Sequence, residues 1–153
     1  ETAKILMAAT QEVDVLIKML CKKHNDKSAE EKAYNFFIKN TYPKLPTIDV
    51  KIPRYDISTQ PFEKWNNNQT PIWWTANNKI KHQRNTKFHE ATLKNTIDAM
   101  AALYISNIYY YLDANPSKQL YQMTKLLYSE ELVDDVCFGE SVQFGINHIY
   151  KLP

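Results

Sequence analysis

The sequence predicts an all-α fold, a helical bundle of about four to five helices with a long proline-rich irregular insertion. Apolar residues recur at spacings of three and four over residues 2–23 and again from Leu93 to Leu112. This is the period of amphipathic helices. Only two glycines, Gly139 and Gly145, occur in 153 residues, and an all-β sandwich usually needs more for its turns. We therefore expect residues 1–153 to form a single helical domain.

The first two expected helices cover residues 2–23 and 28–40. Because the chain begins with Glu1 already inside a helical pattern, we expect further residues upstream. Ser28 and Glu31 have the spacing of a capping box at the start of the second helix. The two apolar stripes comprise Ile5, Leu6, Ala9, Val13, Leu16, Ile17 and Leu20, and then Tyr34, Phe37 and Ile38.

Residues 41–75 contain five of the seven prolines and many large apolar side chains. Proline removes a hydrogen-bond donor and fixes φ, so a long helix does not fit here. We expect an ordered arm packed on the helices, with a short helix near residues 62–67. We interpret Trp65, Trp73 and Trp74 as residues that attach this arm to the core; stacking on nucleic-acid bases is the alternative.

The strongest helical pattern begins at Asn77 or at Lys87 and ends at Asp113. Its second half is apolar on almost every side, which is typical of a bundle centre or of a subunit interface. A further helix is expected over residues 117–129, and the alternation of Val142, Phe144 and Ile146 also allows a short C-terminal hairpin.

Composition excludes several classes of protein. Scarce glycine excludes a dinucleotide-binding fingerprint and a phosphate-binding Walker loop. The formal charge of +2 neither requires nor excludes a nucleic-acid ligand. Cys21 and Cys137 are too few for a disulfide framework, so we expect a reducing, cytoplasmic compartment. The sequence contains no apolar run of transmembrane length, so no membrane association is expected.

Residues 79–89 concentrate chemistry-bearing side chains: four cations and two of the four histidines. If this segment is helical, Lys81, Asn85 and His89 lie in one row at i, i+4 and i+8. His89 then lies where the apolar stripe meets solvent, a favourable place for a general acid or base. Arg84 can grip a phosphate with two parallel donors, and Asn85 can orient the imidazole. Lys79 and Lys87 are candidates for binding the substrate.

No metal or other cofactor is expected at this segment. His82 and His89 are seven residues apart, about 10 Å along a helix, whereas one ion needs ligands at about 2 Å. His24 and His148 are isolated from the other histidines in the sequence, so we interpret them as surface residues.

The segment Arg84-Asn85-x-x-x-His89 is similar to the Arg-polar-x(3)-His signature of HEPN domains (higher eukaryotes and prokaryotes nucleotide-binding). The resemblance implies a metal-independent endoribonuclease of a bacterial toxin–antitoxin or anti-phage system. It also implies a homodimer in which Arg84 stabilises the transition state, His89 acts as general acid or base, and Asn85 orients the groups. RNA would be cleaved through attack by its 2′-hydroxyl.

A second segment, Trp73-Trp74-x-x-x-Asn78-x-x-Lys81-His82-x-Arg84, resembles one found in uncharacterised bacterial helical proteins. That pattern implies that His82 and Arg84 are the functional residues, with Lys81 beside them. The functional histidine is therefore His89 by one resemblance and His82 by the other, and the sequence leaves both open.

Two functions from different classes follow from these residues. The first is a HEPN-like domain that cleaves or binds RNA, together with an antitoxin or defence-system partner. The second is a catalytically silent helical module for oligomerisation or partner binding, in which Arg84 and His89 belong to a solvated helix start. The two hypotheses differ in whether these side chains converge in a cleft.

Overall fold

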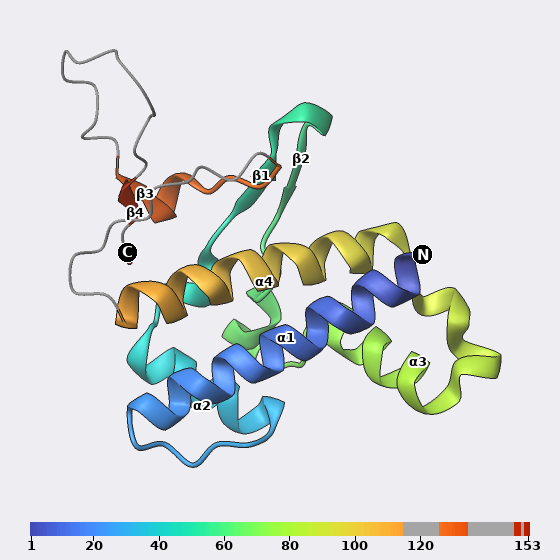
Figure 1. The fold of residues 1–153 in the computed structure, drawn as a ribbon, viewed down its shortest axis with the longest axis horizontal. Helices are drawn as coiled ribbons and strands as arrows, with labels where there is room; N and C mark the ends of the chain where they lie inside the picture. Colours follow the sequence, from blue (N-terminus) through green and yellow to red (C-terminus); the bar gives the residue numbers. More distant parts are fainter. Residues whose placement is uncertain (115–125, 135–148, 151) are drawn as a thin grey trace.

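Four α-helices dominate the computed structural model, which describes residues 1–114, 126–134, 149–150 and 152–153. The mostly helical architecture expected from the sequence is confirmed for these residues. Figure 1 shows α1 and α4 crossing the centre of the molecule, with α2 and α3 at opposite ends. The helix expected over residues 117–129 lies outside the described residues up to 125, and residues 126–129 are not helical. The helices are α1 (Thr2–Lys23), α2 (Glu31–Thr41), α3 (Ile72–Lys87) and α4 (Leu93–Ala114).

Helices α1 and α4 run parallel to each other. At one end the Thr96 hydroxyl, which donates to the Thr92 carbonyl at 2.9 Å, also lies 3.4 Å from the carbonyl of Thr2. At the other end the Lys23 ammonium lies 3.2 Å from the Asp113 carboxylate. Both helices bury side chains in one core, which explains why residues 2–23 show such a regular apolar stripe. Most of that predicted stripe is buried, but Ile5 is exposed and Leu16 is only partly buried.

The predicted capping box at the start of α2 is wrong. Helix α2 starts after Glu30, which makes no capping bond through its side chain, and the backbone N–H of Ser28 donates to Asp26 instead. The Glu31 carboxylate turns toward the arm, where it accepts hydrogen bonds from Trp65 Nε1 at 2.6 Å and from the Thr70 hydroxyl at 2.8 Å. Glu31 therefore joins two segments rather than capping its own helix.

The proline-rich arm contains a β-hairpin that the sequence analysis did not predict. Strand β1 (Val50–Ile52) pairs antiparallel with β2 (Ile57–Thr59), and Asp56 makes the turn with a left-handed φ of 50°. Figure 1 shows this hairpin projecting beyond the helices. Strands of three residues are too short for their alternation to be recognised among prolines. The expected short helix near residues 62–67 is present as a 3-10 helix over Glu63–Asn67.

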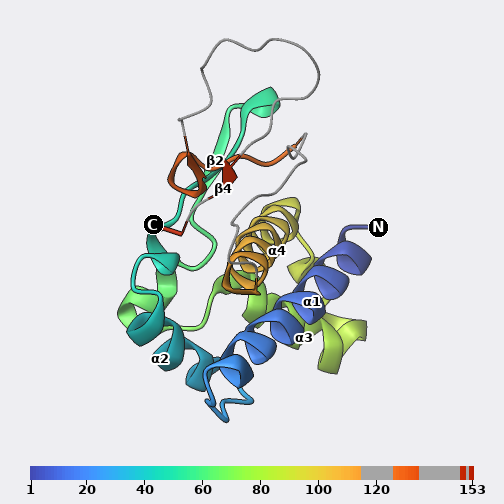
Figure 2. The same ribbon diagram turned by 60° about the vertical axis from the view of Figure 1, so that its left-hand side comes forward.

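The C-terminal segment returns to this hairpin. Lys51 and Tyr128 exchange both backbone hydrogen bonds, at 2.7 and 2.9 Å, on the free side of β1. Strand β3 (Val133–Asp134) pairs antiparallel with β4 (Ile149–Tyr150), and Figure 2 shows this pair near the base of the β1–β2 hairpin. The alternating residues 142–146, for which we considered a hairpin, lie outside the described residues.

The three tryptophans attach the arm to the core, as interpreted from the sequence. All three are buried. The Phe62 ring stacks on Trp65 at 4.5 Å between ring centres, and Trp73 Nε1 donates to the carbonyl of Pro61 over 2.8 Å. Because their faces are used in this packing, these rings are not available to stack on bases.

We expect Glu31→Ala to destabilise the protein by about 1–3 kcal/mol, because it leaves the buried indole N–H of Trp65 without an acceptor. Urea unfolding followed by tryptophan fluorescence measures the change. The matched control is Glu30→Ala, which removes a carboxylate that makes no capping bond. An equal loss in the two variants would contradict the role assigned to Glu31.

Candidate functional site

The expected site residues lie on a sharp elbow between α3 and α4, here defined as residues 79–90. Inside α3, Gln83 has the non-helical angles φ −138° and ψ 44°. A 3-10 turn over Phe88–Glu90 follows, and α4 begins only at Leu93. The long helix expected from Asn77 or Lys87 to Asp113 is confirmed from Leu93 onward, but a continuous helix through the elbow is wrong. The predicted row of Lys81, Asn85 and His89 is interrupted at Gln83.

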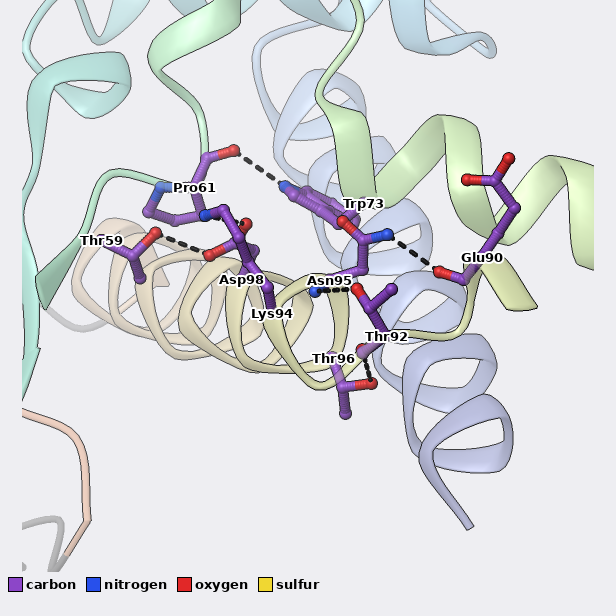
Figure 3. A network of polar contacts seen from close by, with 9 residues as sticks. All are labelled: Thr59, Pro61, Trp73, Glu90, Thr92, Lys94, Asn95, Thr96 and Asp98. Carbon is purple, nitrogen blue, oxygen red and sulfur yellow. Dashed lines mark hydrogen bonds and ion pairs between the residues drawn. The ribbon is translucent and has the colours of Figure 1, made fainter. Parts of the chain in front are cut away.

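Both ends of the elbow are held by polar contacts. The Lys79 ammonium lies 2.7 Å from Glu90 Oε1, and this hydrogen bond lowers the pKa of the Glu90 carboxyl. Figure 3 shows the Asn95 side chain donating to the Glu90 carbonyl, at 2.9 Å. The Thr92 hydroxyl accepts the backbone N–H of Asn95 over 3.1 Å, which is an N-cap for α4. These contacts fix the exit of the elbow while leaving its middle in solvent.

The middle of the elbow displays the predicted residues without burying them. Lys81, His82, Arg84, Asn85 and His89 are exposed, as is Lys79, and Lys87 is partly buried. Among the described residues, no ion pair involves the side chains of Lys81, Arg84 or Lys87. Lys81 and Arg84 are therefore open to a ligand, while the partly buried Lys87 also helps to lower the pKa of the Glu90 carboxyl.

Two further contacts give the elbow its chemical character. The Arg84 guanidinium lies 6.0 Å from the centre of the Phe88 ring, and Phe88 is 50% exposed. The His89 side chain is 70% exposed, with Nε2 4.0 Å from Glu90 Oε1. The elbow thus brings the predicted residues into one surface segment, but one copy of the chain does not enclose Arg84 and His89 in a cleft.

A second polar group, missed by the sequence analysis, lies at the start of α4. The buried Asp98 carboxylate accepts the Thr59 hydroxyl at 2.7 Å and the Lys94 ammonium at 3.1 Å (Figure 3). It lines a cleft between the arm and the starts of α3 and α4, together with Lys64. Both oxygens of Asp98 are engaged, so this carboxylate ties the hairpin to α4 and is not a free acid.

A third group joins the C-terminal ends of α1 and α4. The Asp113 carboxylate accepts the Tyr42 hydroxyl at 2.9 Å, and His24 Nε2 lies 3.1 Å from the same oxygen. Lys23 contacts the other oxygen. His24, although isolated from the other histidines in the sequence, therefore belongs to a polar group in the structure. No local signal could have found this contact, because the sequence does not show that the two helices end together.

The surroundings of Asp113 and Cys21 shift the pKa values of both groups. Burial alone would raise the pKa of Asp113, but the hydrogen bonds from Tyr42, Lys23 and His24 outweigh it and hold the pKa below its ordinary value. Burial raises the pKa of the Cys21 thiol to about 12. Cys21 is therefore an uncharged core residue and a poor nucleophile.

Metal ligands do not gather among the described residues: no three His, Cys, Asp or Glu side chains lie together in a way that would hold an ion. Within the same residues, no helix is long and apolar enough to span a membrane.

No protein-family model, curated protein or solved structure matches the chain. The resemblance to HEPN domains therefore stays a prediction that rests on the motif.

We expect acid to weaken the wild-type protein more than Asp113→Asn. A carboxyl whose pKa is lowered by folding stabilises the protein above its unfolded pKa, ordinarily 3.8, and this contribution is lost as the pH falls through the folded pKa. Urea unfolding between about pH 6 and about pH 3 measures the difference. Asp56→Asn is the control, because Asp56 is exposed and Asn also tolerates its left-handed φ. Parallel pH profiles for the wild type and Asp113→Asn would contradict the assignment.

Proposed function

We propose that the chain is an RNA-binding domain that holds an unpaired strand on the elbow. The observation that carries the proposal is a set of cations outside every ion pair of the described residues, the exposed Lys81 and Arg84 and the partly buried Lys87, beside the exposed ring of Phe88. Cations at a protein surface are normally solvated or paired, and three in one elbow form a local positive patch on a nearly neutral chain.

The chemistry of the elbow favours RNA in single-stranded form. Lys and Arg side chains bind phosphate oxygens, with release of counterions from the nucleic acid. An aromatic ring with a guanidinium nearby is suited to stacking on an unstacked base, which is how single strands of RNA are usually recognised. The polar side chain of Asn85 is placed in the same exposed segment for hydrogen bonds to a base or to a 2′-hydroxyl.

We expect the triple substitution Lys81→Ala, Arg84→Ala and Lys87→Ala to weaken RNA binding and to reduce its salt dependence. If each cation neutralises one phosphate, the slope of log K against log salt becomes shallower by about 2. Fluorescence anisotropy with a labelled single-stranded RNA at several salt concentrations measures both effects.

The matched control removes the same charge from exposed lysines elsewhere, through Lys27→Ala, Lys32→Ala and Lys44→Ala. Phe88→Ala is expected to weaken binding by about 1–3 kcal/mol with an unchanged slope, because it removes stacking alone. Equal weakening by the two triple variants would refute a site on the elbow.

The second candidate function is metal-independent cleavage of RNA, and the joint placement of Arg84, Asn85 and His89 on the elbow supports it. In this reaction the 2′-oxygen attacks the adjacent phosphorus and the 5′-oxygen leaves. His89 would move a proton, Arg84 would stabilise charge on the phosphorane, and Asn85 would orient the imidazole. Because His89 is 70% exposed in one copy, a homodimer must cover it to exclude water.

For this candidate, we expect purified protein to cleave RNA in excess EDTA, and Arg84→Ala and His89→Ala to lower the rate by about 10²–10⁴-fold. Gel analysis of a labelled RNA measures the rate. His82→Ala decides between the two histidines, and Lys44→Ala is the control for loss of an exposed cation. RNA that is bound but never cut would reject cleavage and leave binding intact.

The biological setting belongs to the same proposal. A bacterial toxin or anti-phage system, with an antitoxin or defence-system partner, is supported by the HEPN resemblance alone. The alternative of a catalytically silent oligomerisation or partner-binding module is supported by a different observation, the exposed apolar residues of α1.

A further inference from the structure

A second cleft lies between α2 and the end of the proline-rich arm, and the proposed functions do not use it. Figure 1 places α2 at the opposite end of the molecule from the elbow. The volume of this cleft is about 310 Å³, whereas pockets for small molecules measure about 300–1,000 Å³. The cleft is therefore of a size for one small ligand. It is lined by Glu31, Lys32, Asn35 and Phe36 of α2 and by Asn68 and Thr70 of the arm.

Asn35 is the residue of this cleft whose hydrogen bonding is incomplete. It is 5% exposed, and among the described residues its Oδ1 has no hydrogen-bond partner. A buried carbonyl oxygen without a donor costs free energy, which an apolar side chain of similar size would avoid. The Asn35 amide therefore does not serve stability, and it is placed to accept a donor from a ligand in the cleft.

The other polar groups of the cleft are already satisfied. Both oxygens of Glu31, one turn before Asn35 on α2, accept hydrogen bonds, from Trp65 Nε1 and from the Thr70 hydroxyl. Asn68 Oδ1 accepts the Lys39 ammonium at 2.8 Å. These bonds fix the arm against α2, so the walls of the cleft are held in place around the one unpaired acceptor.

An exposed aromatic ring lies next to this acceptor. Phe36 is 73% exposed and lines the same cleft. Aromatic side chains stack on the faces of unstacked bases, and an Asn amide pairs with N6 and N7 of adenine through two parallel hydrogen bonds. The neighbouring Asn35 and Phe36 thus supply an edge contact and a face contact for the same ring.

We propose that this cleft binds an adenine ring, which donates from its 6-amino group to Asn35 Oδ1 and stacks on Phe36. Because most of Phe36 is in solvent, its ring can turn to admit the ligand to the buried amide. The ring belongs either to a free nucleoside or to an unpaired adenine of an RNA strand, since both present the same amino group and the same face.

The first test is titration of the full ¹⁵N-labelled chain with adenosine and with purine riboside, which lacks the 6-amino group, followed by amide resonances in NMR spectra. We expect saturable shifts in residues 31–36 and 68–70, with adenosine bound at least about 10-fold more tightly than purine riboside, because only adenosine gives Asn35 a donor. Equal affinities, no saturable binding of adenosine, or shifts confined to the elbow would overturn the proposal.

Two variants test the two contacts separately. We expect Asn35→Leu to abolish the preference for adenosine over purine riboside without lowering the melting temperature, because it removes an unpaired buried amide. We expect Phe36→Ala, a change at an exposed position, to weaken adenosine binding by at least about 10-fold through loss of stacking. The matched control is Tyr55→Ala, which removes a 60% exposed ring from the hairpin.

Phe36→Ala decides the matter even if Asn35→Leu does not fold. Adenosine bound by Phe36→Ala as tightly as by Tyr55→Ala would overturn the cleft as the site. So would a folded Asn35→Leu protein that still prefers adenosine to purine riboside.

A further arm distinguishes the two sources of the ring, and this arm alone rests on the proposed RNA binding. Labelled oligoadenylate and oligouridylate of equal length are compared by fluorescence anisotropy. If an adenine of RNA enters the cleft, Phe36→Ala removes the preference for oligoadenylate, whereas the triple variant of Lys81, Arg84 and Lys87 retains it. If the ligand is a free nucleoside, the two strands bind equally while adenosine still binds. Because the adenosine titration uses no RNA, failure of the cleft and failure of the elbow are distinguishable.

Discussion

The parallel packing of α1 on α4 is the constraint on which the other elements depend. Two helices that run in the same direction cannot be joined by a short turn, so the chain must return along their whole length before α4 begins. Helix α2, the proline-rich arm and α3 together make this return. Apart from its projecting hairpin, the arm is consequently part of the core, and Trp65 of the arm is buried together with Trp73 and Trp74 at the start of α3.

The two ends of the α1–α4 pair are held by different chemistry. At the N-terminal end, the Thr96 hydroxyl lies 3.4 Å from the Thr2 carbonyl, a long distance for a hydrogen bond. At the C-terminal end, one carboxylate, Asp113, collects donors from Tyr42, His24 and Lys23. Because α2 ends beside this group, Asp113 connects three helix ends that are far apart in the sequence.

The sequence was sufficient for α1 and for most of α2 and α4, but not for α3, whose first residues were expected to belong to the irregular arm. The bounds of α1 and the buried residues of its stripe follow from the spacing of apolar residues, and the short helix before Asn68 follows from its local composition. The start of α4 could not be predicted, because the cationic run is compatible with helix until the non-helical angles of Gln83 are known. The role of Glu31 was missed for a related reason. The donors to its carboxylate oxygens, Trp65 and Thr70, lie more than 30 residues away in the sequence.

The candidate site shows the same limit. Lys79, Lys81, Arg84 and His89 were singled out from local composition, spacing and motif, and they are exposed in the structure. The predicted row of Lys81, Asn85 and His89 assumed a continuous helix. The non-helical angles of Gln83 interrupt that helix, so the three side chains do not form the row. No sequence motif marks the Asp113 group. Its members come from three elements, and only the packing of the helices brings them into contact.

The direction of α1 and α4 also has an electrostatic result. Each helix is equivalent to about half a positive charge at its N-terminus and half a negative charge at its C-terminus. In an antiparallel pair these dipoles would oppose each other, whereas in this parallel pair they add. Their common positive end lies on the side of the elbow, and their negative end lies at the Asp113 group. Helix α3 ends at Lys87, so its negative end lies beside these two positive ends at the elbow, and the dipole effects act only within about the first and last turns of the helices.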